Sequence, residues 1–482
     1  MSRFHSSLSR RDFMKALGIT GAGIGTAAAA STTFKDIDGM ITSGAAPKKP
    51  WWVKEADKAT VEFDWSQIER FDARKVMNSP MGPPQWVSTE EWANVEKVAA
   101  DNQANWIKEG KPGYTLRDHA LYRGAMGGEG SPGVTSYTWL GPQKSPTPEK
   151  LGTTAWQGTP EENTAMLRSA LRFFGAADIG VVELDENVKK LVYTYPRVAP
   201  YKRYEFEAVD QGYEDDEKWV IPSTKKLYVV SIVSQSSIDG YTTTPSWIQR
   251  AASDNTVRLN SGILAATQEF LRTLGYQGLA GHERNAIGPA PAFATLAGLG
   301  ELCRNTQVLT PDYGLMVRSV RLITDLPLAP TKPIDAGIWR FCHDCAKCAE
   351  ACVSQAIPHE KEPSWDIPGG WNNPGKKVWY VNAVKCQSTR NMLTRDCGLC
   401  MTACVYTKKD YAGIHKVVKG TISSTGMFNS FFKNMDDFFG YGTEFGPNYN
   451  PLLGNFNENA DDFWTNPIPQ FGVNSMIGLQ NR

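Results

Sequence analysis

One stretch of the chain, residues 342–404, contains eight of its nine cysteines and restricts the possible folds more than any other feature. The first half has the spacing Cys-x2-Cys-x2-Cys-x3-Cys, and the second half has Cys-x10-Cys-x2-Cys-x3-Cys. Three cysteines at intervals of three residues let a tight loop surround a cubane iron–sulfur cluster. The fourth cysteine lies one residue further on and ligates the other cluster in two-cluster proteins. The spacing therefore predicts two 4Fe-4S clusters.

The same pattern assigns four cysteines to each predicted cluster. The first cluster is expected to bind Cys342, Cys345, Cys348 and Cys404, and the second Cys386, Cys397, Cys400 and Cys352. Structural zinc usually takes two separated Cys-x2-Cys pairs, and cysteines three residues apart in a tight loop are poor disulfide partners. The pattern departs from the usual motif in two ways. Val353 and Val405 stand where proline is usual, and ten residues rather than two follow Cys386.

The N-terminus has the features of an export signal. Residues 9–15 read Ser-Arg-Arg-Asp-Phe-Met-Lys, and a weakly apolar run follows at 16–30. Paired arginines before such a run are typical of twin-arginine signals, so we exclude residues 1–46 from the fold. The twin-arginine route moves folded proteins, which suits clusters assembled in a reducing cytosol. Signal and cysteines together predict an exported redox protein on the outer face of the cytoplasmic membrane.

Composition excludes some classes of function. The chain has 482 residues with 51 basic and 51 acidic side chains, so its net charge is zero and it lacks the basic footprint of a nucleic-acid-binding protein. Its body contains no stretch of the ~18–20 apolar residues that crossing a bilayer requires. The length allows one large or two medium domains.

Apolar periodicity and helix-start signals predict an α/β pattern between residues 159 and 330. Helices are predicted at 89–100 with Thr89 as cap, at 159–174, at 253–274 and at 291–298, and strands at 179–184, 227–233 and 319–326. We therefore divide the chain into a body at 47–334, a cluster module at 335–415 and an aromatic-rich tail at 416–482. The tail is expected to be an extended stretch that packs back on the body.

This order of parts resembles the corrinoid-dependent respiratory reductive dehalogenases of organohalide-respiring bacteria. The likeness covers most of the chain and includes several further segments in order. These are Asn285 with 297–301 (Ala-Gly-Leu-Gly-Glu), 313–318 (Tyr-Gly-Leu-Met-Val-Arg), 324–327 (Thr-Asp-Leu-Pro), His359–Lys361, Trp379 and 463–467 (Phe-Trp-Thr-Asn-Pro).

The resemblance implies a fold and a set of cofactors. The body would be nitroreductase-like and would bind a cobamide in its base-off form, and the C-terminal module would be ferredoxin-like. The chain has six histidines and no Asp-x-His-x-x-Gly motif, which agrees with a cobalt that lacks a protein histidine ligand. Asn285, and His359 and Trp379 in the aromatic insert 359–385, would help to enclose the corrinoid.

The resemblance also implies catalytic residues. Family members use a tyrosine proton donor beside a basic residue, which Arg318 matches, and a pocket amide, which Asn285 matches. No tyrosine stands at the corresponding position near residues 255–258. Tyr241, Tyr276 and Tyr313 remain, of which we favour Tyr241. An alternative for Arg318 is an ordinary ion pair in the core, and Cys303 is expected to be a buried apolar residue rather than a ligand.

The main hypothesis is therefore an exported reductive dehalogenase. It would replace halide by hydrogen on an organohalide, a chlorinated aromatic or alkene, using two electrons and a proton. Expected partners are a small integral-membrane anchor protein and an electron donor, either a hydrogenase complex or a quinol. Two alternatives are an enzyme like epoxyqueuosine reductase, which combines the same cofactors, and an electron-transfer subunit with no substrate of its own.

Overall fold

The computed structural model describes residues 49–126, 139–281, 286–407, 414–438 and 451–465. The predicted export signal and Asn285 lie outside the described residues. The chain begins with β1 (Lys54–Glu55), η1 (Ala73–Lys75), α4 (Pro83–Trp86), α5 (Thr89–Glu109), α6 (Leu116–Met126) and η2 (Glu149–Leu151). Strand β1 pairs antiparallel with β10 (Ile334–Asp335), which lies just before the cysteine-rich stretch.

A four-stranded antiparallel sheet forms the centre of the body. Its strands lie in the order β2 (Asp178–Glu183), β5 (Tyr228–Gln235), β9 (Val317–Thr324) and β6 (Gly278–Leu279). Strand β5 pairs with both β2 and β9, and seven of its eight residues are buried. Burial on both faces explains its run of branched side chains instead of a simple alternation. The predicted α/β fold class is thus observed as a mixed α/β body.

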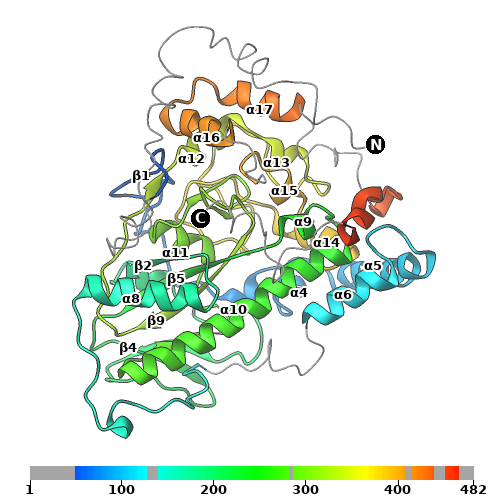
Figure 1. The fold of residues 1–482 in the computed structure, drawn as a ribbon. Coiled ribbons are helices and arrows are strands. Elements are labelled where there is room, and N and C mark those ends of the chain that lie inside the picture. The colour runs from blue at the N-terminus through cyan, green and yellow to red at the C-terminus, as the bar shows by residue number, and fades with distance from the viewer. Residues whose placement is uncertain (1–48, 127–138, 282–285, 408–413, 439–450, 466–482) are drawn as a thin grey trace.

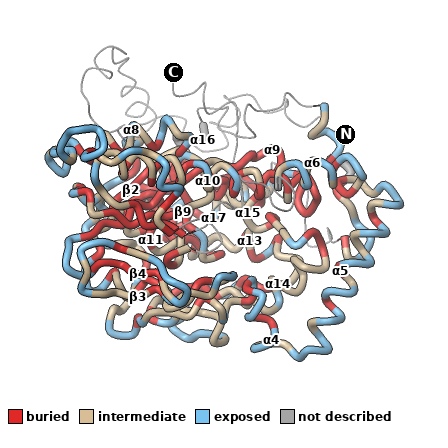
Figure 2. Tube along the Cα trace, turned by 90° about the horizontal axis from the view of Figure 1, so that it is seen from below, coloured by how far each residue is buried: buried red, intermediate tan, exposed pale blue. Residues whose placement is uncertain are grey.

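Helices cover one face of this sheet and a helix with a strand pair covers the other (Figures 1 and 2). Helices α8 (Pro160–Phe173) and α10 (Trp247–Leu274) pack against Val230 and Ile232 of β5. On the opposite face, Val229 packs with α11 (Ala290–Leu296) and with β4 (Lys218–Pro222), the parallel partner of β3 (Arg203–Glu207). The short helices η3 (Val188–Leu191) and α9 (Ile238–Tyr241) lie in the connections.

The ends of the helices follow local signals. Thr159 caps α8 in a capping box with Glu162, as predicted, and Gly275 ends α10 with a φ of 91°. The cap of α5 is Ser88 rather than Thr89, because the Ser88 hydroxyl accepts from the backbone N–H of Glu91. Helix α10 begins at Trp247, six residues before the predicted start, because Ser246 caps it.

The cysteines of the 342–404 stretch lie on four short helices and in the turns beside them (Figure 1). These elements are α12 (Ile338–Asp344), α13 (Lys347–Glu350), α14 (Ala383–Met392) and α15 (Leu399–Thr402). Residues of α12 and α15 share one hydrophobic core with body residues such as Trp52, Tyr241 and Leu309. That core includes the hairpin of β7 (Glu301–Leu302) and β8 (Val308–Leu309), so the body reaches directly into the cysteine region.

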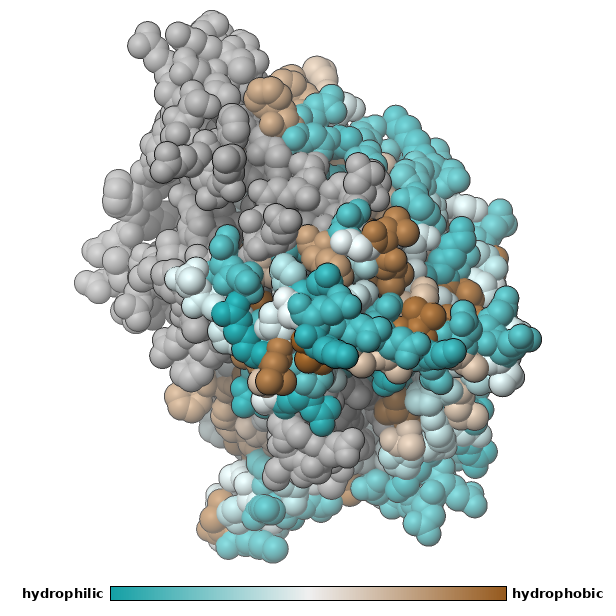
Figure 3. All heavy atoms as spheres, turned by 90° about the vertical axis from the view of Figure 1, so that its right-hand side faces the viewer, coloured by the Kyte–Doolittle hydropathy of each residue, from teal (hydrophilic) through white to brown (hydrophobic). Residues whose placement is uncertain are grey.

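The C-terminal tail is helical where it is described, which corrects the expectation of an extended stretch. It forms α16 (Ile414–Ser424), α17 (Asn429–Phe438), η5 (Pro451–Leu453) and η6 (Glu458–Trp464). Phe432 of α17 is buried in the shared core, whereas Phe438 is exposed. The face in Figure 3 is mainly hydrophilic among the described residues, with hydrophobic side chains in small groups. None of the helices in the described ranges is both long and apolar enough to span a bilayer.

Candidate active site

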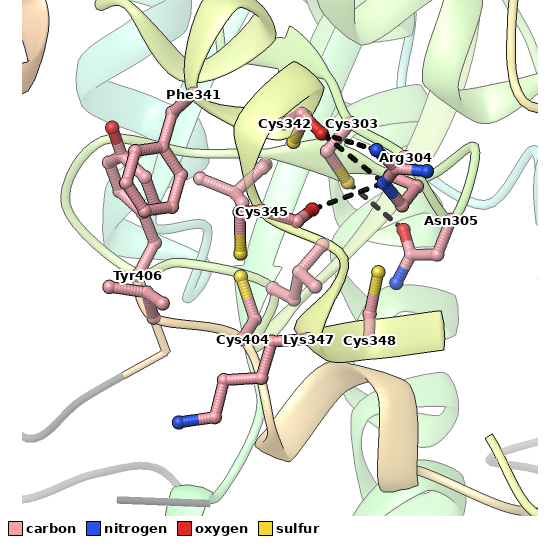
Figure 4. A pocket seen from close by; sticks show the side chains of 13 residues that line it. Cys303, Arg304, Asn305, Phe341, Cys342, Cys345, Lys347, Cys348, Cys404 and Tyr406 are labelled. Atoms are coloured by element: carbon pink, nitrogen blue, oxygen red, sulfur yellow. Dashed lines mark hydrogen bonds between the residues drawn. The ribbon is translucent and has the colours of Figure 1, made fainter. Parts of the chain in front are cut away.

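A cavity of about 350 Å³, including the part open to solvent, is lined by Cys303 and by four cysteines of the 342–404 stretch, and we call it the sulfur cavity. Cys342 comes from α12, Cys348 from α13, Cys345 from the turn between them, and Cys404 from the loop after α15. Figure 4 shows the sulfur atoms of Cys345 and Cys404 pointing toward one another across the cavity. These are the four cysteines that the spacing assigns to the first cluster.

The hairpin β7–β8 holds helix α12 at both ends. At the helix N-terminus, the Glu301 carboxylate accepts backbone hydrogen bonds from Ala336 (2.8 Å) and Ile338 (3.0 Å). At the C-terminus, the Arg304 guanidinium donates to the Cys342 carbonyl oxygen (2.8 Å). An acid at the N-terminus and a base at the C-terminus both complement the helix dipole. The backbone that carries the first cysteines is therefore fixed by the body.

Burial strongly disfavours free thiolates in the sulfur cavity. It raises the pKa of the Cys345 thiol to about 12, with neighbouring Cys404 adding to the rise. It also raises the pKa of Cys342, where Cys345 adds to the effect. Thiolates become stable in such a place only when a metal centre supplies the compensating positive charge. All nine cysteines are free, so none of these thiols is used in a disulfide.

The arrangement fits a cluster better than a single ion. Within the described residues, no group of three or more His, Cys, Asp or Glu side chains could hold one metal ion. The cysteines of a cubane bind different iron atoms, so their sulfurs are separated by the width of the cluster. The lining also includes the buried side chain of Asn305, whose amide nitrogen has no hydrogen-bond partner among the described residues other than the Cys400 thiol.

The remaining four cysteines form a second group. Burial raises the pKa of the Cys397 and Cys400 thiols, and neighbouring Cys386 and Cys352 add to both rises, so these four cysteines lie near one another. The Asn305 amide opposes that rise at Cys400. Asn305 lines the sulfur cavity as well, so it lies between the two cysteine groups.

A second cavity, which we call the large cavity, has a volume of about 940 Å³ including the part open to solvent. Its walls are mostly apolar and come from the N-terminal segment, α11, the hairpin β7–β8 and the insert. The lining includes Val61, Phe63, Trp65, Leu191, Ala292, Leu296, Leu302 and Tyr380. Large apolar cavities with a few polar groups are the usual form of organic-cofactor sites.

The polar groups of the large cavity are poorly satisfied. The hydroxyl of Thr295, the amide nitrogen of Asn372 and the amide oxygen of Asn373 are buried without a hydrogen-bond partner in the described structure. Lys376 also lines the cavity, and burial lowers the pKa of its amine to about 8. Its ammonium lies 5.1 Å from the centre of the Tyr380 ring. These groups fit a large apolar ligand that carries polar and anionic substituents.

The two cavities share a wall in the hairpin β7–β8. Leu302 and Thr306 line the large cavity, whereas the three residues between them, Cys303, Arg304 and Asn305, line the sulfur cavity. These residues form the turn of the hairpin, where Thr306 has a φ of 61°, and this change of direction lets one short segment face both spaces. Groups held in the two cavities would therefore be close neighbours.

Tyr241 and Arg318 lie in a buried polar cluster. The Arg318 guanidinium donates to the Ser253 hydroxyl (3.2 Å). Burial raises the pKa of Tyr241, and Asp396 adds to this, while Arg318 and Ser253 oppose it. Burial alone would raise the pKa of Asp396, but Arg390, Arg250 and Arg318 lower it to about 2. Arg318 and Tyr241, the tyrosine favoured among the three candidates, are thus neighbours.

The other residues singled out in the sequence lie in different surroundings. Trp379 is buried and its ring lies 4.4 Å from the Arg304 guanidinium. His359 is exposed, contacts Gln355 (3.0 Å) and lines neither cavity. Cys303 also lines the sulfur cavity. Its thiol donates to the side-chain oxygen of Asn305 and to the carbonyl oxygen of Gln307.

Sequence reasoning missed several polar residues of both cavities. Arg304, Asn305, Asn372, Asn373 and Lys376 were not singled out. The only local signal for Arg304 is that this charged residue lies in a short, mostly apolar stretch between two buried strands. The residues around Lys376 belong to a Gly- and Pro-rich insert, whose path cannot be inferred from periodicity.

Comparison with known proteins identifies the family. Residues 48–328, more than half of the chain, match the model of the family described as reductive dehalogenase subunit. The chain is 32% identical to the chloroethene reductive dehalogenase of Dehalococcoides mccartyi strain VS, over 92% of this chain and 96% of the relative. It is 30% identical to the trichloroethene reductive dehalogenase of Dehalococcoides mccartyi strain ATCC BAA-2266, over 98% and 99% of the two chains.

A solved structure shares the fold. The catabolic reductive dehalogenase NpRdhA, in complex with 3-bromo-4-hydroxybenzoic acid, superposes with a TM-score of 0.55 at 18% identity. The alignment covers 81% of this chain, and the chain spans 49% of that longer protein. The family match and the two relatives decide against the two alternatives stated above. The chain therefore belongs to the reductive dehalogenase family, whose members act on carbon–halogen bonds, as a catalytic subunit.

Proposed function

We propose that the protein removes halide from chlorinated ethenes at a bound corrinoid in the large cavity, fed with electrons by two 4Fe-4S clusters. The substrate class is supported by the relatives named for chloroethene and trichloroethene. The corrinoid is supported by a related solved structure, which is described as suggesting a mechanism for B12-dependent dehalogenation. The reaction consumes two electrons and one proton, and it replaces the carbon–chlorine bond by a carbon–hydrogen bond with release of chloride.

The observation that carries this proposal is the wall shared by the sulfur cavity and the large cavity. A redox enzyme needs its electron carrier close to the reacting cofactor, and here three consecutive residues separate the two spaces. The corrinoid supplies the reductive cleavage of the carbon–halogen bond. The protein supplies position, an apolar surrounding, electrons and a proton.

Each cavity has residues that suit its proposed content. Cys342, Cys345, Cys348 and Cys404 would hold the cluster nearer the corrinoid, and Cys352, Cys386, Cys397 and Cys400 the other. In the large cavity, Asn372, Asn373 and Thr295 would bind polar substituents of the corrinoid. A protonated Lys376 would bind the phosphate of its nucleotide tail.

Tyr241 is proposed as the proton donor on the resemblance and on its contact with Arg318, because its described side chain lines neither cavity. Its raised pKa keeps the phenol protonated at neutral pH, so the proton is available when the substrate carbon requires it. Arg318 beside it would stabilise the phenolate as the proton leaves. Asn285 is proposed as the pocket amide on the resemblance alone, since it lies outside the described residues.

The cellular setting is part of the same proposal. The twin-arginine pattern at Ser9–Lys15 supports export of the folded, loaded protein. At the outer face of the cytoplasmic membrane, a small integral-membrane protein would anchor it. A hydrogenase complex or a quinol would supply electrons, which makes the enzyme the terminal reductase of an anaerobic respiration.

Anaerobic purification followed by metal and halide analysis tests the proposal. We expect eight irons and one cobalt for each chain, and chloride release from a chlorinated ethene in the presence of a strong reductant. A halogenated phenol assayed in parallel distinguishes the aromatic alternative. Protein with full iron but no cobalt binding, or with both metals and no halide release from either substrate, would refute the proposed activity.

A further inference from the structure

Two buried cations flank the sulfur cavity, and only one of them is neutralised by a carboxylate. Lys347 is 2% exposed and forms ion pairs with Asp436 and with Asp437 (3.0 Å), both on α17. Arg304 is 1% exposed, and no carboxylate of the described chain lies within ion-pair distance of it. Figure 4 shows its guanidinium at the edge of the cavity.

Arg304 uses its donors on neutral partners. Its Nε donates to the carbonyl oxygens of Cys342 (3.2 Å) and Cys345 (3.1 Å), and Nη2 donates again to Cys342 (2.8 Å). Its Nη1 donates to the carbonyl oxygens of Pro358 (2.9 Å) and Glu360 (2.8 Å). The ring of Trp379 lies 4.4 Å from the guanidinium carbon. These contacts fix the side chain, but they leave its full positive charge in place.

A buried charge without a counter-ion is strongly disfavoured. Carbonyl dipoles and an aromatic face reduce this cost without supplying a negative charge. A cubane bound by four thiolates carries a net negative charge in both of its oxidation states, and the reduced state carries one unit more. The cavity that Arg304 borders is the place where such a group would lie.

We propose that Arg304 is the counter-cation of the cluster held by Cys342, Cys345, Cys348 and Cys404, and that its charge sets the reduction potential of this cluster. The inference rests on the proposed function, because it requires a cluster in the sulfur cavity. A cation beside the cluster stabilises the reduced state, which is the more negative one, and so raises the potential. Lys347 lacks this effect, because its charge is balanced by Asp436 and Asp437.

Charge and hydrogen bonding can be separated at this position. Arg304→Lys keeps the charge and loses most of the hydrogen bonds, whereas Arg304→Gln loses the charge and keeps a donor. Arg340→Gln is the control, because Arg340 lies on α12, the helix that carries Cys342, is half exposed and already pairs with Asp335 (2.7 Å). Iron content and a redox titration followed by electron paramagnetic resonance are measured on the anaerobically purified full chain.

We expect Arg304→Lys and Arg340→Gln to keep eight irons and the original potential. Arg304→Gln should lower the ratio of reduced to oxidised first cluster at a fixed potential by about tenfold, a shift of about 59 mV for one electron. If Arg304→Gln instead loses about half of the iron while Arg304→Lys retains it, charge is again the deciding property. Equal behaviour of the two variants, in potential or in iron loss, would overturn the inference.

The titration separates this inference from the proposed function. It needs neither cobalt nor substrate, so a shifted potential in protein that releases no halide would count against the activity alone. A normal activity with an unshifted potential in Arg304→Gln would count against Arg304 alone. Protein in which no cluster signal can be reconstituted would overturn both.

Discussion

The sulfur cavity and the large cavity differ in the kind of side chains that would bind their cofactors. The sulfur cavity is small, and its lining presents thiols from three short segments held by the body. The large cavity is larger and mostly apolar, and its lining comes from five parts of the chain. A covalently bound inorganic group needs a few ligands at defined positions. A large organic cofactor needs extended apolar surface with a few polar contacts.

The two cavities should therefore hold their proposed cofactors independently, although they share a wall. Among the described residues none lines both cavities, and only the segment 302–306 supplies residues to each. Changes elsewhere in one lining should therefore remove one cofactor and leave the other. The following predictions test this independence, beginning with the largest expected effect.

Removal of one thiol from the sulfur cavity should abolish activity through loss of iron. In Cys345→Ala the first cluster loses one of its four ligands, so we expect the iron content to fall from about eight to about four for each chain, while corrinoid binding persists. Cys303→Ala is the matched control, because Cys303 lines the same cavity but is not an expected ligand. Iron analysis of the two proteins decides, and eight irons in Cys345→Ala would contradict the assignment.

Filling the large cavity should have the converse effect. Ala292→Trp places an indole in the lining, and we expect loss of cobalt and of activity with all eight irons retained. Ala290→Trp on the same helix α11 is the control, because Ala290 does not belong to the lining. Cobalt and iron are measured together. Parallel loss of both metals would mean that the two sites are not independent.

Removal of the proposed proton donor should leave both cofactors in place. For Tyr241→Phe we expect kcat to fall by about 10²–10⁴, the usual contribution of a positioned general acid. Cobalt and iron contents should be unchanged, because Tyr241 lines neither cavity. Tyr276→Phe is the control, since Tyr276 lies elsewhere and bonds the Trp156 carbonyl oxygen. Full activity of Tyr241→Phe would assign the proton to another group.

The smallest effect concerns the pH dependence of corrinoid binding. The pKa of Lys376 is about 8 in the protein alone, so the amine loses its charge as the pH rises through this value. If its charge binds the corrinoid phosphate, affinity should be highest below pH 8 and fall by up to about tenfold for each pH unit above it. Lys376→Met should bind more weakly below pH 8 and show a flat profile. Corrinoid titrations between pH 6.5 and 9.5, a range that spans the pKa of Lys376, measure the affinity of the original protein and of Lys376→Met.

Local signals explain which parts of the fold could be predicted. Thr159 with Pro160, and the branched runs of β5 and β9, act through neighbouring residues, so helix α8 and both strands follow from them. The strands β7 and β8 have two residues each and carry no readable period. Their position depends on contacts with α12, more than thirty residues away.

The candidate site likewise has one part that local sequence signals predict and one part that they do not. Cysteine spacing is a local property, and the structure brings Cys342, Cys345, Cys348 and Cys404 to one cavity. The lining of the large cavity comes from segments far apart in sequence, and their meeting depends on the complete fold. His359 illustrates the limit, because a matching motif places it in the insert but the structure leaves its side chain at the surface.

The contact between Lys347 and helix α17 bears on the order in which the protein is assembled. Lys347 stands between two cysteines of the sulfur cavity, and its carboxylate partners Asp436 and Asp437 are synthesised after every cysteine. We therefore expect the loop to be accessible to iron delivery until α17 docks against it. A chain ending at residue 426 should accept iron but surrender it to a chelator faster than the full-length protein, which a time course of chelation would measure.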